Sequence, residues 1–136
     1  MRYYYAGNRG LVGKAYNQLM PGEGGNTDTV DYTNYEQTLQ HLRQHNPTHV
    51  IINAATVGGL QEDIDKSFEL LLTNLKIQNN IFEACAKLNI DRVLLQGSTC
   101  SYPEDGPQPF MELQLMTGKP YEGYLTTALP KLVGMY

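Results

Sequence analysis

The sequence predicts an α/β fold with a doubly wound, mostly parallel sheet. A tyrosine-rich run at residues 2–6, which can form a strand, precedes a Gly-x-x-Gly-x-x-Gly loop at 7–13 and a stretch, 11–20, that can form a helix. Two short apolar runs, at 49–55 and 92–96, have the composition of strands buried in a parallel sheet. Helical segments separate these runs, so the connections are long enough for right-handed crossovers. We therefore expect about four parallel strands.

The segment after the first predicted helix favours turns over a strand. Pro21 and Gly22 stop that helix, and residues 21–29 are turn formers. Only residues 29–32 could be extended before the next helix begins. We therefore expect a truncated sheet whose second strand is absent or very short. In folds of this class that strand ends in the residue that reads an adenosine ribose, about 20 residues after the glycine loop, and its counterpart is expected to be missing.

The next helix has start and stop signals. Thr33 and Glu36 form a capping-box pattern, although Asp31 could also cap the helix. The helix is expected to run to about His45, because Asn46-Pro47 ends it.

Three histidines, His41, His45 and His49, are four residues apart, a spacing that invites a metal-binding interpretation. Pro47 ends the helix before His49, so the three cannot share one helical face. We interpret them as surface residues and predict no metal site.

The remaining elements alternate in the same way. In chain order we expect a strand within 49–55, a long helix over about 63–88, a strand over 92–96, a loop over 104–123 and a helical segment over 125–136. Apolar residues recur at helical spacing in the long helix, which Asn74, Gln78 and Asn79 interrupt with polar groups. Pro130 interrupts the last segment.

The glycine loop is the main functional signal. Glycine lets the backbone turn tightly and approach a phosphate without a Cβ in the way. A helix that begins there offers free N–H groups and the positive end of its dipole. A strand, a glycine loop and a helix in this order are therefore typical of a site for a dinucleotide pyrophosphate. Glycine is common in this chain, at 13 residues, so a helix-start turn with no ligand is the alternative.

Composition limits the size, partners and compartment of the protein. The 136 residues suit one globular domain, since 41% are hydrophobic and 18% charged. A net charge of −4 without a basic stripe argues against nucleic acid and anionic membranes as partners. No apolar run approaches the roughly 18 residues of a membrane span. Cys85 and Cys100 do not make a disulfide framework, so a reducing, cytoplasmic setting is expected.

Four stretches, in order along the chain, resemble one family. They are Ala-Gly-Asn-Arg-Gly-Leu-Val-Gly at 6–13, Ala-Ala-Thr-Val-Gly-Gly at 54–59, Gly-Ser-Thr-Cys-Ser-Tyr-Pro at 97–103 and Pro-Gln-Pro-Phe-Met-Glu at 107–112. Together they are similar to the GDP-L-fucose synthases, NADP-dependent epimerase/reductases of the extended short-chain dehydrogenase/reductase superfamily. Members of that family are more than twice as long as this chain. The resemblance therefore implies one Rossmann-like NAD(P)-binding domain over 1–136, equivalent to their amino-terminal part, with the substrate domain absent.

The resemblance implies a site for NADP, with NAD less favoured. The glycine loop would hold the pyrophosphate, and Arg9 matches an arginine that helps to hold the 2′-phosphate, a role suited to a guanidinium; a solvated loop arginine is the alternative. Small residues in 53–55 would let adenosine or ribose approach the backbone, with plain packing as the alternative. Asn74 matches an asparagine that supports the active-site hydrogen bonds. The residues so assigned to the cofactor are Gly7, Asn8, Arg9, Gly10, Leu11, Val12, Gly13, Asn53, Ala54, Ala55, Asn74 and Lys131.

The resemblance also implies catalytic roles near residue 100, with a nucleotide sugar as the substrate. Ser98 resembles the serine that hydrogen-bonds the sugar carbonyl. Cys100 resembles the cysteine that moves protons during epimerisation, which a thiol can do if its pKa lies near the working pH. The alternative for Cys100 is a small loop residue without a role.

The reductive Tyr-x-x-x-Lys motif of the superfamily is altered. Lys131 falls on the family's lysine, which lowers the pKa of the tyrosine and holds the nicotinamide ribose, but Thr127 takes the place of the tyrosine. Tyr124 lies seven residues before Lys131, about 10.5 Å along a continuous helix. A helix that begins only at Pro130, where proline is tolerated, would leave 124–129 as a loop able to bring Tyr124 back.

Three functional hypotheses follow. The chain is a dinucleotide-binding domain with weak or no catalysis alone, a non-enzymatic structural or interaction module on a degenerate Rossmann fold, or one part of an enzyme whose other part lies elsewhere. Self-association into a homo-oligomer is expected, because an incomplete sheet leaves apolar side chains uncovered. The side chains expected to be exposed are Leu71, Leu72, Leu75, Leu132 and Val133.

Overall fold

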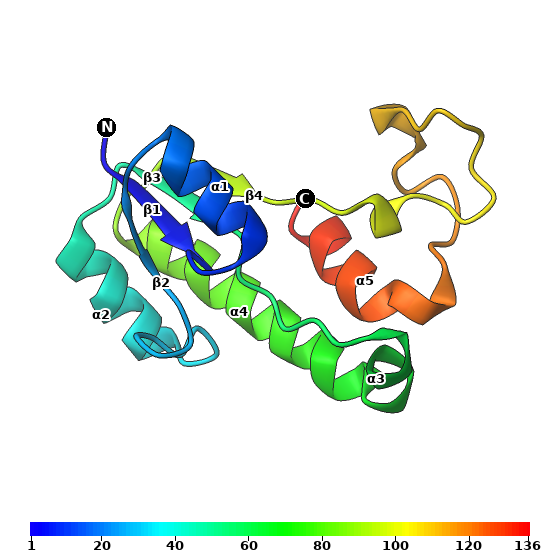
Figure 1. Ribbon diagram of the computed structural model, residues 1–136, viewed down its shortest axis with the longest axis horizontal. Coiled ribbons are helices and arrows are strands. Elements are labelled where there is room, and N and C mark those ends of the chain that lie inside the picture. The colour runs from blue at the N-terminus through cyan, green and yellow to red at the C-terminus, as the bar shows by residue number, and fades with distance from the viewer. The chain divides into compact units, whose positions relative to one another are not determined.

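The computed structural model describes the backbone of residues 1–136 and all side chains except those of Leu60 and Asp63 (Figure 1). The chain divides into two compact units. The first comprises Met1–Ala55 and Lys76–Gln96, and the second comprises Thr56–Leu75 and Gly97–Tyr136. The helices are α1 Leu11–Leu19, α2 Tyr35–His45, α3 Leu60–Asp65, α4 Ser67–Lys87 and α5 Leu125–Val133. Among the described residues, none of these helices combines the length and the apolar character needed to cross a membrane.

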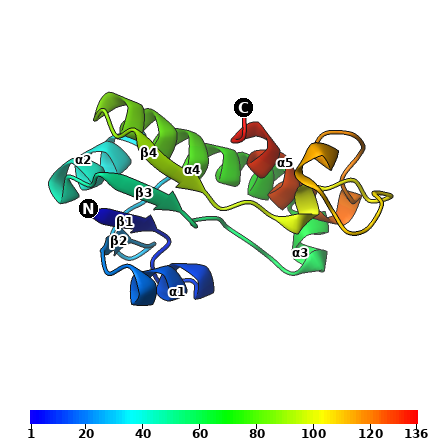
Figure 2. The ribbon, with the colours of Figure 1, turned by 90° about the horizontal axis from the view of Figure 1, so that it is seen from above.

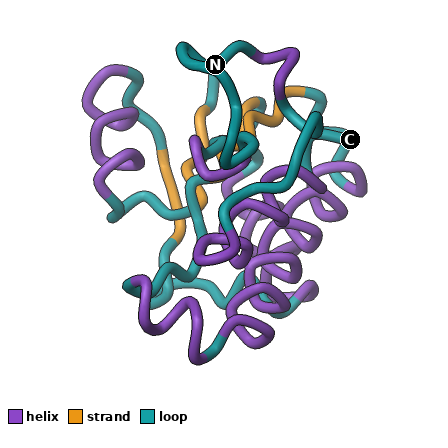
Figure 3. The backbone as a smooth tube through the Cα atoms, turned by 90° about the vertical axis from the view of Figure 1, so that its right-hand side faces the viewer, coloured by secondary structure: helices purple, strands orange, loops and turns teal.

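One parallel sheet forms the centre of the first unit. Its strands are β1 Tyr3–Ala6, β2 Glu23–Gly25, β3 His49–Ile52 and β4 Arg92–Leu95. They lie in the order β2-β1-β3-β4, all parallel, and are drawn in orange in Figure 3. The two central strands are β1 and β3, in which Tyr4 pairs with Val50 and Ala6 with Ile52. The predicted α/β class and the predicted parallel sheet are confirmed.

Helices cover both faces of this sheet. In the first unit, α1 lies on one face, and α2 with the Lys76–Lys87 part of α4 lies on the other (Figure 2). Successive strand residues point to opposite faces, so Tyr5 stacks on Tyr16 of α1, with ring centroids 6.3 Å apart. The neighbouring strand positions build the core with α2 and α4. This core contains Tyr4, Ala6, Val30, Tyr32, Leu39, Leu42, Val50, Ile52, Ile77, Ile81, Ala84 and Cys85.

The second strand is very short, as predicted, and two of its three residues are glycines, which favour turns over strands. Gly25 ends β2 and lies against the hydroxyls of Tyr4 and Tyr32, which hydrogen-bond each other at 2.8 Å. A Cβ at Gly25 would lie 2.3 Å from Tyr32 Oη and 2.4 Å from Tyr4 Oη. The residues thought able to extend, 29–32, form turn and loop instead, since the Val30 amide donates to Asn26 O at 3.0 Å. The loop still places Val30 and Tyr32 in the core.

The expected cap of α2 is wrong, although its end is confirmed. The helix begins one residue later, with Asn34 as its N-cap, whose Oδ1 accepts from Gln37 N at 3.1 Å. Thr33 does not cap the helix, and its hydroxyl and its amide both donate to Asp31 Oδ1, at 2.7 and 2.9 Å, which holds Thr33 in the turn before the helix. The helix ends at His45, and Asn46 adopts a left-handed φ of 45°.

The three histidines are half-buried, so their interpretation as surface residues is wrong. His41 and His45 pack on the Tyr4 ring, with centroids 5.8 and 5.4 Å away, while His49 lies in β3 and its ring is 5.1 Å from that of Tyr3. His45 Nδ1 also contacts the carboxylate of Glu23 of β2. Burial lowers the pKa of His41, and the neighbouring His45 adds to this. In the part of the chain that the structure describes, no set of three or more His, Cys, Asp or Glu residues is grouped to hold a metal ion.

The predicted helix over 63–88 consists of two helices. Between them, Lys66 leaves helical geometry, with φ −119° and ψ 27°, although its amide still donates to Glu62 O at 2.9 Å. At the other end of α4, Cys85 lies in the core, and burial raises the pKa of its thiol to about 12.

The segment between β4 and α5 is mostly irregular, as predicted. A 3-10 turn at Thr99–Ser101 packs on α5, and an antiparallel bridge joins Pro103 to Pro120. The rings of Tyr102 and Phe110 stack with centroids 4.6 Å apart.

The apolar residues expected to be exposed differ in their burial. Leu72 and Val133 are exposed by 40% and 55%, and Leu71 and Leu75 are half-buried. The expectation for Leu132 is wrong, because α5 turns this side chain inward and leaves it only 6% exposed.

Replacing Gly25 by alanine is expected to destabilise the protein by about 2–3 kcal/mol, because the new methyl group would push the Tyr4–Tyr32 pair apart. Urea unfolding measures the change. The control is Gly59→Ala, where an added Cβ meets nothing within 4 Å. Equal effects of the two substitutions would contradict the role of Gly25.

Candidate functional site

The glycine loop brings the end of β1 directly against the end of β3. Gly7 has a left-handed φ of 89°, which side chains disfavour, and a Cβ there would lie 2.8 Å from Ala54 N. A Cβ at Gly13 would lie 2.3 Å from Gly7 O. Both glycines are therefore required by close backbone contacts, and the simpler interpretation of a helix-start turn does not account for the approach of Gly7 to β3.

This loop stands at the switch point of the sheet. The chain passes from β1 to β2 on one side and reaches β3 on the other, so the carboxyl ends of β1 and β3 flank a crevice where ligands bind in such folds. Gly10 is the N-cap of α1 and offers no side-chain cap. The N–H groups of the first helical turn have no partner within the helix, so the start of α1 can receive an anion. The loop fits a pyrophosphate.

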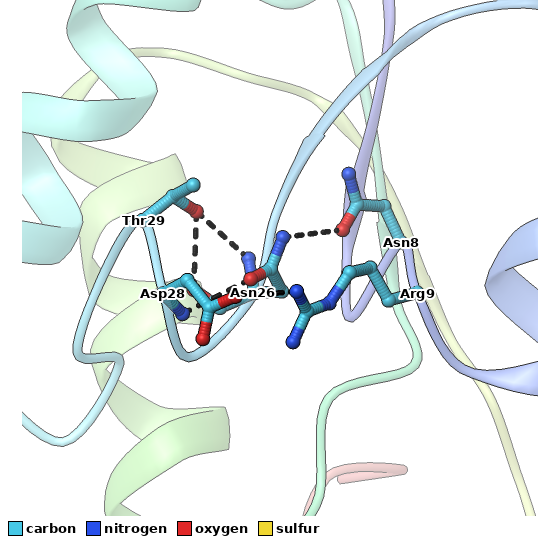
Figure 4. A network of polar contacts seen from close by, with 5 residues as sticks. All are labelled: Asn8, Arg9, Asn26, Asp28 and Thr29. Atoms are coloured by element: carbon cyan, nitrogen blue, oxygen red, sulfur yellow. Dashed lines mark hydrogen bonds and ion pairs between the residues drawn. The ribbon is translucent and has the colours of Figure 1, made fainter.

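A polar network joins the glycine loop to the turn after β2 (Figure 4). Gly25 O accepts from Gly7 N at 2.8 Å and from Asn8 N at 3.2 Å. The Asn8 side chain accepts from Asn26 Nδ2 at 3.1 Å, and Arg9 forms an ion pair with Asp28.

Sequence reasoning missed Asp28. The turn-forming composition of 21–29 suggested that no residue would stand where an adenosine ribose is read. Asp28 nevertheless follows the short β2 strand and faces the glycine loop. The available signal was its position about 20 residues after the glycine loop.

The end of β3 offers small residues and one unpaired amide. Ala54 packs against the core and Ala55 is exposed. Both polar atoms of the Asn53 side chain are buried and have no hydrogen-bond partner among the described residues. A buried amide without partners is rare in folded proteins, so Asn53 can take a polar group of a ligand.

Asn74, in the second unit, is fully engaged by backbone groups. Its Oδ1 accepts from Thr56 N at 2.7 Å, and its Nδ2 donates to Thr56 O at 2.9 Å and Thr126 O at 3.2 Å. The bond to Thr126 O replaces a helical hydrogen bond of α5, because Pro130, four residues later, has no N–H to donate to that carbonyl. Asn74 thus supplies the donor that Pro130 lacks, and it ties the loop after β3 to α5.

Ser98 and Cys100 lie in one 3-10 turn. Ser98 Oγ accepts from Cys100 N at 3.2 Å and so caps the turn. Cys100 is a free, half-buried thiol. The neighbouring Ser101 is buried, and its hydroxyl donates to Ala128 O of α5 at 3.5 Å, which positions the turn on the helix.

Tyr124 and Lys131 are not brought together by α5. The helix begins at Leu125, as the helical segment predicted over 125–136 required, and not at Pro130, so the alternative of a loop over 124–129 does not occur. Tyr124 is 38% exposed and its ring lies 5.6 Å from that of Tyr121. Lys131 is buried, and burial lowers the pKa of its ammonium group. Thr127, four residues before Lys131, shares its helical face.

The candidate residues thus form two groups. Those of the glycine loop and of the β3 end belong to the first unit, and Asn74, Ser98, Cys100, Tyr124 and Lys131 belong to the second.

Comparison with known proteins gives consistent matches. The model of the "NAD dependent epimerase/dehydratase family" matches residues 3–127. The chain is 30% identical over 141 residues to "GDP-L-fucose synthase 1" of Arabidopsis thaliana, covering 98% of this chain and 43% of that protein. It thus spans less than half of this relative.

Solved structures agree with the fold. A "gdp-l-fucose synthetase" from Naegleria fowleri, bound to NADP, matches with a TM-score of 0.81 and 25% identity, covering 96% of this chain and 41% of that one. The "GDP-mannoheptose C4 reductase" from Campylobacter jejuni, with NADP bound, matches with a TM-score of 0.88 and 22% identity, covering 98% and 44%.

Replacing Asn74 by alanine is expected to destabilise the protein by about 2 kcal/mol, because it removes three hydrogen bonds to the backbone, of which the one to Thr126 O is buried. Thermal or urea unfolding measures the loss. Asn79→Ala, at an exposed position of the same helix, is the matched control and should change stability by less than about 0.5 kcal/mol. A loss no larger at Asn74 than at Asn79 would count against the clamp.

Lys131 makes stability depend on pH with a definite sign. Its pKa is lowered in the folded state, so between that lowered pKa and the unfolded pKa of ~10.4 the unfolded chain binds more protons, and folding becomes more favourable as pH rises through this window. Lys131→Met keeps the length of the side chain without the charge. The variant is expected to unfold at a higher temperature than the wild type at pH 7, with the difference shrinking towards pH 10. A difference that stays constant with pH would refute this.

Proposed function

The chain belongs to the NAD dependent epimerase/dehydratase family, and from this premise we propose that it binds a nicotinamide dinucleotide, with NADP preferred to NAD. The close approach of Gly7 to Ala54 carries the proposal, because the turn after β1 meets the end of β3 backbone to backbone with no Cβ between them, as in a glycine turn that holds a pyrophosphate. The uncapped start of α1 adds a positive dipole end at the same place.

The preference for NADP rests on Arg9. Its guanidinium is 60% exposed beside the crevice and is suited to a bidentate contact with a 2′-phosphate. Two of the solved structures similar to this chain contain NADP. The small residues Ala54 and Ala55 would receive the adenosine ribose, and Asn53 would offer its unpaired amide.

We propose that the domain alone has weak or no catalytic activity. A bound nicotinamide would give or take a hydride, and a nucleotide sugar is the substrate class suggested by similarity to GDP-L-fucose synthases. Ser98 would hydrogen-bond the sugar carbonyl, Cys100 would move protons and Lys131 would hold the nicotinamide ribose. Reduction also needs a proton donor at the carbonyl, and Thr127, which takes the place of the family tyrosine, is a much weaker acid than a phenol.

A non-enzymatic structural or interaction module is the second candidate. The separation of Tyr124 from Lys131 favours it. The exposed side chains of Leu72 and Val133 favour self-association of such a module. The two free thiols, Cys85 and Cys100, fit a reducing, cytoplasmic location. This candidate predicts that neither NADPH nor NADH binds at millimolar concentration, which distinguishes it from the first.

Replacing Arg9 by alanine is expected to weaken NADPH binding about tenfold and NADH binding less than threefold, because only NADPH carries the 2′-phosphate. Isothermal titration calorimetry on both proteins measures the two dissociation constants. Lys14→Ala, which removes an exposed cation from α1, is the control and should affect both cofactors equally. A wild-type protein that binds neither cofactor would rule out the proposal.

A further inference from the structure

The ion pair between Arg9 and Asp28 is open to solvent beside the glycine loop. The two side chains are 60% and 63% exposed. An exposed ion pair is weak, since water screens it and two long side chains must be held in place. A more highly charged anion can therefore take Arg9 from Asp28.

The position of Asp28 is nevertheless fixed by its neighbours. Asn26 Oδ1 accepts from Asp28 N at 3.0 Å, and Asn26 Nδ2 donates to Asn8 Oδ1 at 3.1 Å. Asn26 N also donates to Thr29 Oγ1 at 2.9 Å, and Thr29 N returns a bond to Asn26 O at 2.9 Å. Asn26 thus holds the turn that carries Asp28 against the loop that carries Arg9 (Figure 4).

This arrangement places a residue that favours NADP, Arg9, beside a residue that favours NAD, Asp28. In sheets of this class, the end of the second strand meets the adenosine ribose, where an acidic residue accepts from a 2′-hydroxyl and an arginine takes a 2′-phosphate. Here both groups are present and are bonded to each other. Resting on the dinucleotide site proposed above, we infer that Asp28 is a specificity-determining residue that opposes NADP, so that the site accepts both NADP and NAD.

The two cofactors meet Asp28 differently. A 2′-phosphate must break the Arg9–Asp28 pair, and its negative charge is then repelled by the nearby carboxylate. A 2′-hydroxyl can donate to the carboxylate of Asp28, which has two oxygens and can keep Arg9 at the other. The advantage that Arg9 gives to NADP is therefore reduced by Asp28, and the wild-type dissociation constants for NADPH and NADH should agree within about tenfold.

The substitution Asp28→Asn tests this, because it removes the charge with little change of shape. Calorimetric titration of the full chain should give NADPH binding about tenfold tighter than in the wild type, and NADH binding unchanged or up to threefold weaker. Asp31→Asn is the matched control, since Asp31 lies in the same segment but bonds Thr33 and not Arg9. It should leave the ratio of the two dissociation constants within about twofold of the wild-type ratio.

The double variant Arg9→Ala/Asp28→Asn locates the effect. If Asp28 acts by holding Arg9, most of the NADPH gain of Asp28→Asn disappears once Arg9 is absent. Asp28→Ser, which also removes the charge, should shift the cofactor ratio in the same direction, and unchanged thermal unfolding shows that each variant is folded.

The outcomes separate this inference from the proposed function. A wild-type protein that binds neither cofactor overturns both. A wild-type protein that binds cofactor, with a ratio that Asp28→Asn and Asp28→Ser change by less than twofold, overturns only the role of Asp28. Weaker NADPH binding in both Asp28 variants overturns it as well.

Discussion

The close contact of Gly7 with the backbone of β3 is the constraint on which the first unit depends. Gly7 directly follows β1, its amide is bonded to the last carbonyl of β2, and its Cα lies where only hydrogen fits beside Ala54. One residue thus connects three neighbouring strands at their carboxyl ends. Its left-handed φ of 89° turns the chain so that α1 starts at the same edge. The crevice and the helix start are therefore consequences of one backbone conformation.

In the second unit, the amide of Asn74 has a comparable part. Its three hydrogen bonds go to backbone groups of Thr56 and Thr126, so it shapes the unit through main-chain positions. Its bond to Thr126 O explains how a proline can stand inside α5. Burial of Lys131 and the packing of Ser101 on Ala128 follow from the course of that helix.

Local patterns predicted most elements, and long-range contacts decided what they missed. The glycine loop, the short second strand and the end of α2 were readable because glycine and proline limit the backbone wherever they occur. The cap at Asn34 is the exception, missed for a local reason, because Thr33 and Asn34 are both good capping residues and the bonds from Thr33 to Asp31 hold Thr33 in the turn before the helix. Asp28 was missed for a long-range reason, because its role arises only when the turn after β2 meets Arg9. Pro130 allowed the alternative of a helix that starts there, because proline inside a helix leaves a carbonyl without its N–H donor. The donor that compensates for this, Asn74, is 56 residues away in the sequence and could not be foreseen.

The tyrosine pair above Gly25 gives the protein a spectroscopic property. Burial is the main cause that raises the pKa of both Tyr4 and Tyr32 above the usual phenol value. The chain has ten tyrosines and no tryptophan, so tyrosine dominates its near-ultraviolet absorption. In alkaline solution Tyr4 and Tyr32 therefore resist ionisation while the fold that buries them is intact. The pair therefore loses its stabilising effect as pH rises above 10, and the late appearance of tyrosinate absorbance marks the pH at which the core around Tyr4 and Tyr32 opens.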